Sequence, residues 1–217
     1  MTGQRDPGAP LGLYKILRPA GEPELIDSVV PPGAEILDLG CGTGRVTNAL
    51  VAVGRKVVAV DFDERMLEHV RGAETVLSRI EDLELGRHFG GAVLMSILVN
   101  VHDEVRRSAL LVACRRHVAP DGVVLIQRYD PRSGLGDAPA ETTTAGVTMR
   151  VSDRRREGHW FSYTIEYDAG EQGHWSFRME NARILSDEEM AATLAQAGLR
   201  LDRWLDPQRR WLTALPV

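Results

Sequence analysis

The segment EILDLGCGTGRVTNAL, residues 35–50, joins the pattern of a strand to the pattern of a helix. Residues 36–39 are mostly apolar, as in a buried parallel strand, and the apolar residues of 46–53 recur at helical spacing. Three alternate glycines stand between the two patterns: Gly40, Gly42 and Gly44. Glycine permits backbone conformations and a close ligand approach that a Cβ atom would obstruct, and the first turn of a helix has free N–H groups. The segment therefore predicts a strand, a ligand-binding turn and a helix.

The alternation of strand and helix patterns continues to residue 129. Further strands are expected at 56–63, 74–78, 91–99 and 122–129, and helices at 64–72 and 103–118. The strand at 122–129 is expected to begin after a turn at residues 120–122, PDG. Strands that alternate with helices indicate an α/β fold with a parallel, doubly wound sheet.

A different pattern follows this alternation. Apolar residues alternate with polar ones at 147–151, 161–167 and 175–179, and the separators DRRREGH and DAGEQG resemble turns. We therefore expect an antiparallel β meander over residues 145–183, with the arginines of DRRREGH in a solvated turn. Ser186 and Glu189 then form a capping box that begins a helix, and 199–205 and 210–216 predict a closing pair of strands.

The composition limits the classes of partner. A formal net charge of −5 argues against binding to the phosphate backbone of nucleic acids, and no apolar run has the length of a membrane span. The first residues lack the pattern of a signal peptide, so we expect a cytoplasmic location. Cys41 and Cys114 are the only cysteines and provide no basis for a disulfide framework or a metal site.

An acidic residue suggests what the glycine turn binds. Asp61 ends the next strand, seventeen residues after Gly44, which suits the paired hydroxyls of a ribose and indicates an adenosine derivative. In a dinucleotide fingerprint that begins at Gly40, the third glycine would fall at position 43 or 45. These positions hold Thr43 and Arg45, which weakens the case for a pyrophosphate ligand such as NAD.

The segment ILDLGCGTGR followed by VVAVDFD resembles motif I and its acidic partner in class I S-adenosylmethionine-dependent methyltransferases. The resemblance covers roughly residues 30–130. It implies a Rossmann-like, mostly parallel seven-stranded sheet with a reversed C-terminal strand, and S-adenosylmethionine as the cofactor. It also implies methyl transfer to the O, N or C atom of a small molecule. The meander is similar in placement to the antiparallel covers of some small-molecule methyltransferases.

The same resemblance implies a set of cofactor-binding residues. Gly40, Cys41 and Gly42 would surround the methionine half, with Asp38 below them and Gly44 closing the turn. Asp61 would hold the ribose and Phe62 would pack on the adenine. Ile80 and Glu81 would face the adenine edge, although Arg79 stands where the family often has an aspartate. Ser96 and Ile97 would face the sulfonium. These assignments are expectations that rest on the match of each residue to the family's motifs.

The acceptor is expected beyond the carboxyl ends of the strands, where open parallel sheets bind their ligands. The polar residues there are Asn100, Arg128 and Tyr129, together with His102, which is either a catalytic base or a solvated side chain. Near the N-terminus, Tyr14 is expected to line the acceptor site and Arg18 to pair with the cofactor carboxylate, or this segment simply packs on the core. On the meander, four aromatic residues are candidates for contact with the acceptor: His159, Trp160, His174 and Trp175. The two tryptophans are alternatively part of the core or of a dimer interface.

We expect one domain over residues 1–217, as a monomer or homodimer. Its parts are an N-terminal helical segment at 1–30, a cofactor-binding half at 31–130, the meander at 145–183 and a closing helix and strand pair at 184–217. The meander either covers the active-site mouth and selects the acceptor or serves as a capping or dimerisation sheet. Two alternatives to a methyltransferase stay open: a protein that binds S-adenosylmethionine or S-adenosylhomocysteine without catalysis, and an NAD-dependent oxidoreductase.

Overall fold

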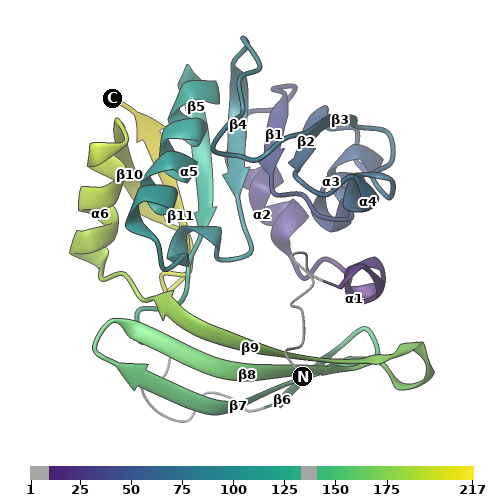
Figure 1. The fold of residues 1–217 in the computed structure, drawn as a ribbon. Coiled ribbons are helices and arrows are strands. Elements are labelled where there is room, and N and C mark those ends of the chain that lie inside the picture. Colours follow the sequence, from purple (N-terminus) through teal and green to yellow (C-terminus); the bar gives the residue numbers. More distant parts are fainter. Residues whose placement is uncertain (1–9, 133–140) are drawn as a thin grey trace.

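A computed structural model describes residues 10–132 and 141–217 and contains two sheets (Figure 1). The larger sheet has seven strands in the order β10-β11-β5-β4-β1-β2-β3. In chain order these strands are β1 (Ile36–Leu39), β2 (Val57–Asp61), β3 (Glu74–Leu77), β4 (Phe89–Leu94), β5 (Val118–Gln127), β10 (Leu199–Trp204) and β11 (Trp211–Pro216). Strands β1 to β5 are parallel, and β11 runs antiparallel to both of its neighbours. The predicted doubly wound sheet with a reversed C-terminal strand is confirmed.

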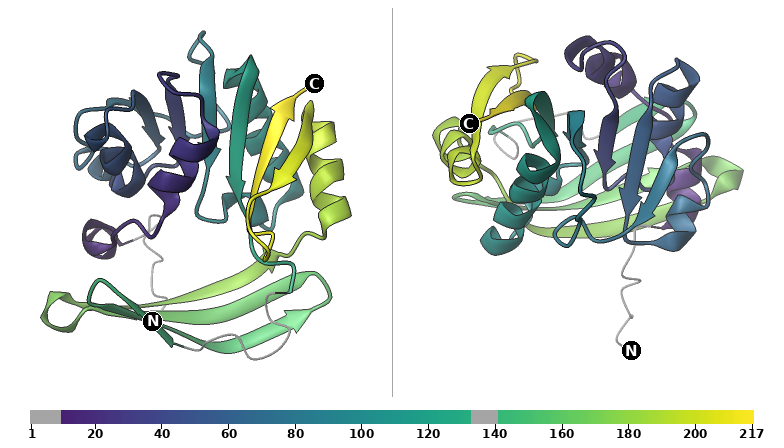
Figure 2. Two further views of the ribbon diagram at one scale, coloured as in Figure 1. Left: turned by 180° about the vertical axis from the view of Figure 1, so that it is seen from behind. Right: turned by 90° about the horizontal axis from the view of Figure 1, so that it is seen from above.

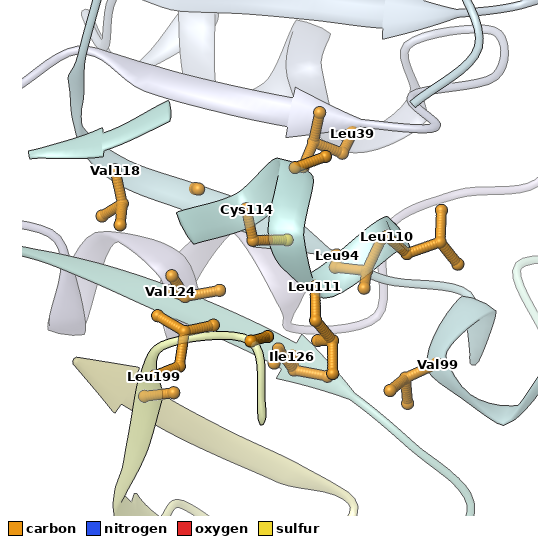
Figure 3. Packing of buried hydrophobic residues seen from close by; sticks show 14 of the residues in the cluster. Leu39, Leu94, Val99, Leu110, Leu111, Cys114, Val118, Val124, Ile126 and Leu199 are labelled. Atoms are coloured by element: carbon orange, nitrogen blue, oxygen red, sulfur yellow. The ribbon is translucent and has the colours of Figure 1, made fainter. Parts of the chain in front are cut away.

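Helices cover both faces of this sheet. Apolar side chains of α2 (Glu22–Val29) and α3 (Arg45–Ala52) pack on one face, and those of α5 (Glu104–His117) and α6 (Asp187–Gln196) pack on the other. Figure 3 shows the second layer, where Leu110, Leu111 and Cys114 of α5 contact apolar side chains from β4 and β5. The short α4 (Glu64–Leu67) follows β2, and within the described residues no helix is long and apolar enough to cross a membrane.

The smaller sheet is an antiparallel meander of β6 (Glu141–Thr144), β7 (Val147–Glu157), β8 (Trp160–Asp168) and β9 (His174–Arg183). It lies across the end of the large sheet toward which the arrows of β4 and β5 point (Figures 1 and 2). The helix α1 (Leu11–Ile16) lies at a height between the two sheets in Figure 1 and in the left view of Figure 2. The meander therefore faces the carboxyl edge of the parallel strands.

Two details of the meander differ from the sequence prediction. The predicted start at residue 145 is too late, because β6 begins at Glu141. The predicted arginine-rich turn is wrong, because β7 continues to Glu157 and the hairpin turn contains only Gly158 and His159. A register shift between Ser152 and Arg155 lets the strand absorb extra residues and continue its pairing with β8. A run of arginines therefore does not by itself identify a turn, because charged side chains also occur on the exposed face of a strand.

The boundaries of two parallel strands also differ from the prediction. Strand β4 ends at Leu94, so residues 95–99 are not strand. Strand β5 begins at Val118, directly after α5, and not at residue 122 as predicted. Residues 120–122, predicted as a turn, belong to the strand, and its pairing with β4 is irregular there. The closing helix matches the prediction: Ser186 Oγ accepts from Glu189 N at 3.1 Å, and Glu189 Oε2 accepts from Ser186 N at 2.7 Å. The division of the chain into four parts stays a prediction.

Candidate active site

The glycine turn is held by the adjacent strand. Both Gly40 N and Cys41 N donate to Val60 O at 2.9 Å, so the turn is bound to the end of β2. Gly40 and Gly42 have φ values of +78° and +56°, a region that other residues rarely adopt. A Cβ atom on Gly40 would lie only 2.9 Å from Leu98 Cδ1. Backbone conformation therefore favours glycine at both positions, and at Gly40 a side chain would also displace the end of Leu98.

Asp61 bonds to the same turn from the end of β2. Its Oδ2 atom accepts from Gly42 N at 2.8 Å, and its Oδ1 atom accepts from Asp63 N at 3.0 Å. The residue is 7% exposed. Each carboxylate oxygen can accept a further hydrogen bond, because an ionised carboxylate has about four acceptor positions. Two such oxygens on one rigid side chain suit a pair of ligand hydroxyls.

A cavity of about 170 Å³ lies against this turn. Eight predicted site residues line it: Tyr14, Gly40, Gly42, Asp61, Phe62, Ile80, Glu81 and Ser96. Six residues that the sequence analysis did not assign to the site also line it: Asp63, Met66, Ser78, Arg79, Leu98 and Arg106. The structure therefore brings together residues from α1, the glycine turn, the ends of β2, β3 and β4, and the first turn of α5.

Two of the unassigned lining residues contact predicted ones. The Arg79 guanidinium lies 5.8 Å from the Phe62 ring centroid, and Arg106 forms a 2.7 Å ion pair with Glu81. The sequence carries no signal for these contacts, because they join segments that are far apart in the chain. The position of Arg79 was visible only as a departure from the family pattern.

Asp38 provides a test of whether these residues fit the expected cofactor. Its side chain is buried, and Oδ2 accepts from Thr47 Oγ1 at 2.6 Å. The other oxygen, Oδ1, has no hydrogen-bond partner among the described residues. Burial raises the pKa of this carboxyl to about 6, against the lowering effect of the Thr47 hydrogen bond. An acceptor without a donor at the foot of the glycine turn fits a ligand with a cationic amino group, as S-adenosylmethionine has.

Asp38 and four other residues expected to bind the cofactor do not line the cavity in the described part of the chain. Cys41 is a buried free thiol, and Gly44 is the N-cap of α3. Arg18 is exposed, and its carbonyl oxygen accepts from Arg45 Nη1 at 3.1 Å. Ile97 follows the lining residue Ser96. Their roles toward the cofactor stay predictions.

The end of β4 has an unusual backbone. Ser96 and Ile97 have φ values of +54° and +56°, which are costly for residues with a Cβ atom and most costly for a β-branched one. Ser96 N donates to Gln127 Oε1 at 2.8 Å, so β5 helps to hold this conformation. The turn directs the chain into the short helix η1 (Leu98–Asn100) and places Ser96 and Leu98 at the cavity. The sequence did not predict this turn, because residues 91–99 have the apolar pattern of a continuous strand.

Tyr14 of α1 closes one side of the cavity. Its ring carbon Cδ1 would lie 3.6 Å from a Cβ atom on Gly42, and its carbonyl oxygen accepts from Thr43 Oγ1 at 3.0 Å. On the other side of α1, a Cβ atom on Gly12 would lie 3.3 Å from Trp175 in β9. The helix therefore joins the glycine turn to the meander.

Tyrosine side chains continue from this helix onto the meander. Tyr129 and Tyr163 share a hydrogen bond of 2.7 Å between their hydroxyl groups. Burial raises the pKa of Tyr14, Tyr129 and Tyr163, and it raises that of Tyr167 to about 12, with a further contribution from Tyr14. All four hydroxyl groups therefore stay protonated near neutral pH and act as neutral donors and acceptors.

Two residues expected to contact the acceptor have structural partners instead. Arg128 is 1% exposed and donates to the carbonyl oxygens of Arg209, Leu185 and Ser186, besides its ion pair with Asp187. Its guanidinium does not line the cavity, and the acceptor contact expected for Arg128 stays a prediction. A buried arginine must satisfy its donors, and the end of β5 offers carbonyl groups for this.

Asn100 is likewise buried, at 2% exposed. Its amide nitrogen donates to Arg183 O at 2.5 Å, and its Oδ1 atom accepts from Tyr129 N at 2.9 Å. Both functional groups of this side chain are therefore used by backbone partners. The acceptor contact expected for Asn100 likewise stays a prediction.

The histidines lie away from the cavity. His102 is exposed, and its ring centroid lies 4.8 Å from that of Trp160 at the start of β8. His159 and His174 are exposed, and His159 Nδ1 lies 3.5 Å from Glu189 Oε2. His102 is thus a contact between the segment after β4 and the meander, and its role as a base stays a prediction.

Comparison with known proteins supports the resemblance. A family model described as a methyltransferase domain matches residues 19–203. An uncharacterised methyltransferase of Mycobacterium tuberculosis is 42% identical over 94 residues, which are 41% of this chain and 39% of that protein. The chain therefore spans about two fifths of the length of this relative.

Other relatives match over more of the chain. The dTDP-3-amino-3,4,6-trideoxy-alpha-D-glucopyranose N,N-dimethyltransferase of Streptomyces venezuelae is 24% identical over 191 residues, 82% of this chain and 81% of that protein. Among solved structures, a sugar N-methyltransferase from Streptoalloteichus has a TM-score of 0.70 at 24% identity, covering 91% of this chain and 87% of that chain. With a family model that matches residues 19–203, the chain belongs to the family of methyltransferase domains.

Proposed function

We propose that the protein transfers a methyl group from S-adenosylmethionine to an amino nitrogen of a small molecule. The observation that carries this proposal is the cavity in which Gly42, Asp61 and Ser96 meet at the ends of three neighbouring strands. Its lining combines close backbone, a bidentate acid and apolar side chains, as an adenosine ligand requires. The family match favours methyl transfer over a nicotinamide-dependent reaction.

The residues present suit each part of this cofactor. The Asp61 carboxylate would accept from the two ribose hydroxyls, and Phe62 and Ile80 would pack on the adenine. The glycine turn leaves space for the methionine half, and the unpartnered Asp38 Oδ1 atom would attract its ammonium group. When bound, S-adenosylmethionine supplies a methyl group on a positively charged sulfur.

The protein contributes mainly by placing the acceptor. With both ligands bound, the amine nitrogen would take the methyl group from the sulfonium, which would leave as a thioether, and the nitrogen would then release a proton to solvent. This displacement needs alignment and exclusion of water more than a catalytic base. Tyr14, Ser96 and Leu98 line the cavity, and the meander lies across the carboxyl edge of the parallel strands (Figure 1).

A nitrogen acceptor is supported by the relatives that match most of the chain. Those from Streptomyces venezuelae and Saccharopolyspora spinosa are named as N,N-dimethyltransferases of dTDP-linked amino sugars. We carry this acceptor class to the present chain as a proposal, with the meander as the cover that selects it. We further propose that the protein acts in the cytoplasm without nucleic-acid or membrane partners. The net charge of −5 supports the absence of a nucleic-acid partner.

Release of S-adenosylhomocysteine over a panel of acceptors tests the proposal. The panel should pair each dTDP-linked amino sugar with the matching sugar that carries a hydroxyl in place of the amine. We expect release only with the amines. Binding of S-adenosylhomocysteine without release for any compound would favour a non-catalytic binding protein, and binding of NAD alone would overturn the assignment.

A further inference from the structure

The segment that follows β5 and the last residue of the meander meet at one buried side chain. Tyr129 lies just after β5, and Arg183 ends β9. Asn100 accepts from the amide of Tyr129 at 2.9 Å and donates to the carbonyl oxygen of Arg183 at 2.5 Å. A single carboxamide therefore joins the end of the large sheet's β5 to the end of the meander, although these residues are far apart in the sequence.

Asn100 belongs to the same short segment as two cavity residues. Ser96 and Leu98 line the cavity, and η1 (Leu98–Asn100) follows them directly. Ser96 and Ile97 are held in the left-handed region, so the path from the cavity to Asn100 has a defined and unusual shape. The position of Asn100 is therefore tied to the wall of the cavity.

From Asn100 the contacts lead to the inner face of the meander. Tyr129, whose amide Asn100 holds, extends its hydroxyl to that of Tyr163 in β8. Its ring also makes an edge contact with Phe161, at 5.9 Å between centroids. An unbroken series of contacts thus runs from the cavity wall through Asn100 and Tyr129 to the centre of the meander.

Arg128, the residue before Tyr129, binds a different part of the protein. It binds Leu185, Ser186 and Asp187 at the start of α6 and Arg209 before β11, and Trp204 lies 4.1 Å from its guanidinium. None of these partners lines the cavity. Arg128 therefore anchors the meander to the closing elements, whereas Asn100 sets it against the cavity.

We propose that Asn100 is a positioning residue for methyl transfer: it sets the meander relative to the cavity, and so aligns the acceptor, without contacting acceptor or cofactor. This inference rests on the proposed function for its kinetic consequence. Its structural part, a coupling between the cavity wall and the meander through one carboxamide, does not require an acceptor.

Two substitutions separate the two hydrogen bonds. Asn100→Ala removes both, whereas Asn100→Asp keeps an acceptor for the Tyr129 amide and loses the donor to Arg183 O. Thr213→Val is the matched control, because Thr213 is also fully buried and loses one hydrogen bond, to Asp202 Oδ2 at 2.9 Å, between β10 and β11. All variants are full-length chains, and their folding is checked by circular dichroism and urea unfolding.

Hydrogen exchange with S-adenosylhomocysteine as the probe measures the coupling. In the parent chain we expect the probe to slow exchange in β8 and β9 by at least threefold. Asn100→Ala should lose this effect while its dissociation constant for the probe stays within threefold of the parent value. Asn100→Asp should speed exchange near Arg183 but spare the amide of Tyr129. Thr213→Val should behave as the parent does.

Kinetics with an amine found on the panel measure the consequence for the reaction. We expect kcat/KM for the amine to fall at least twentyfold in Asn100→Ala, with KM for S-adenosylmethionine within threefold, whereas Thr213→Val should retain the parent values. Parent-like exchange and parent-like kcat/KM in a folded Asn100→Ala would overturn the inference. If the parent binds no probe, the proposed function fails, and unaltered exchange at Tyr129 and Arg183 in Asn100→Ala would separately overturn the coupling.

Discussion

Gly42 N donates to the Asp61 carboxylate at 2.8 Å, so the glycine turn after β1 and the acid at the end of β2 form one unit. The bond forms between parallel neighbours, whose carboxyl ends lie side by side. It orients the carboxylate before any ligand arrives. Preorganised acceptors of this kind lose little conformational freedom on binding, which favours affinity.

Asp61→Ala is expected to weaken S-adenosylhomocysteine binding by about 10- to 150-fold, or about 1.5–3 kcal/mol, because a charged acceptor for two hydroxyls is lost. Isothermal titration calorimetry measures the change. Asp27→Ala is the control, since Asp27 forms an exposed ion pair with Arg55 away from the cavity. An unchanged dissociation constant in folded Asp61→Ala would show that Asp61 does not hold the ligand.

Gly42→Val is expected to reduce ligand affinity more than stability. The added side chain starts 3.6 Å from the Tyr14 ring and enters the space beside the cavity, and φ of +56° adds backbone strain of about 1–2 kcal/mol. Gly86→Val is matched for strain, because Gly86 has φ of +66° and nothing within 4 Å of its Cβ position among the described residues. Equal loss of affinity in both variants would contradict the role of Gly42.

Asp38 is expected to make both stability and binding depend on pH. Burial raises its pKa from 3.8 to about 6, so the folded protein binds more protons than the unfolded chain between about pH 4 and 6. The contribution of Asp38 to the free energy of unfolding therefore falls as pH rises through this window, by on the order of 2–3 kcal/mol. Urea unfolding measures the free energy of unfolding of the parent and of Asp38→Asn at each pH over this range. The difference between the two gives the contribution of Asp38.

A cationic ligand reverses the sign of this effect, because it favours the ionised carboxylate. The affinity of the parent for S-adenosylhomocysteine should therefore rise as pH increases through about 6, whereas Asn at position 38 should give a flatter profile. Calorimetry at several pH values measures both profiles. Parallel profiles would show that Asp38 does not interact with the amino group of the ligand.

His102→Gln tests the catalytic base considered from the sequence. The imidazole packs on Trp160 outside the cavity lining, so we expect kcat to fall by less than about fivefold and the pH profile to keep its shape. A loss above 100-fold together with a changed profile would restore His102 as the base.

Replacement of the meander tests whether it covers the acceptor. A short Gly/Ser linker can replace residues 141–182, which keeps Tyr129 and Arg183, the two hydrogen-bond partners of Asn100. We expect S-adenosylhomocysteine affinity to stay within about tenfold and transfer to be lost. Size-exclusion chromatography should accompany the assay, since a shift in oligomeric state with normal transfer would favour a dimerisation sheet.

The sequence by itself determined the parallel sheet, the glycine turn and the acid that faces it. These features are local: buried parallel strands are apolar throughout, the turn needs glycine, and Asp61 ends its own strand. The capping box of Ser186 and Glu189 is also local, and both of its hydrogen bonds formed as expected. Structural features that depend on residues close together in the sequence could therefore be predicted without the tertiary structure.

Only the tertiary structure decided the roles of Asn100 and Arg128. Both follow parallel strands and carry polar groups, as ligand-binding residues do, and the sequence assigned them to the acceptor. Their partners lie 29 to 83 residues away for Asn100 and 57 to 81 residues away for Arg128. A buried polar side chain must find a partner, and which partner it finds depends on what the fold places beside it. The fold places backbone groups of the segments after β5, at the end of β9, before α6 and before β11 beside these two side chains, so they bind the protein itself.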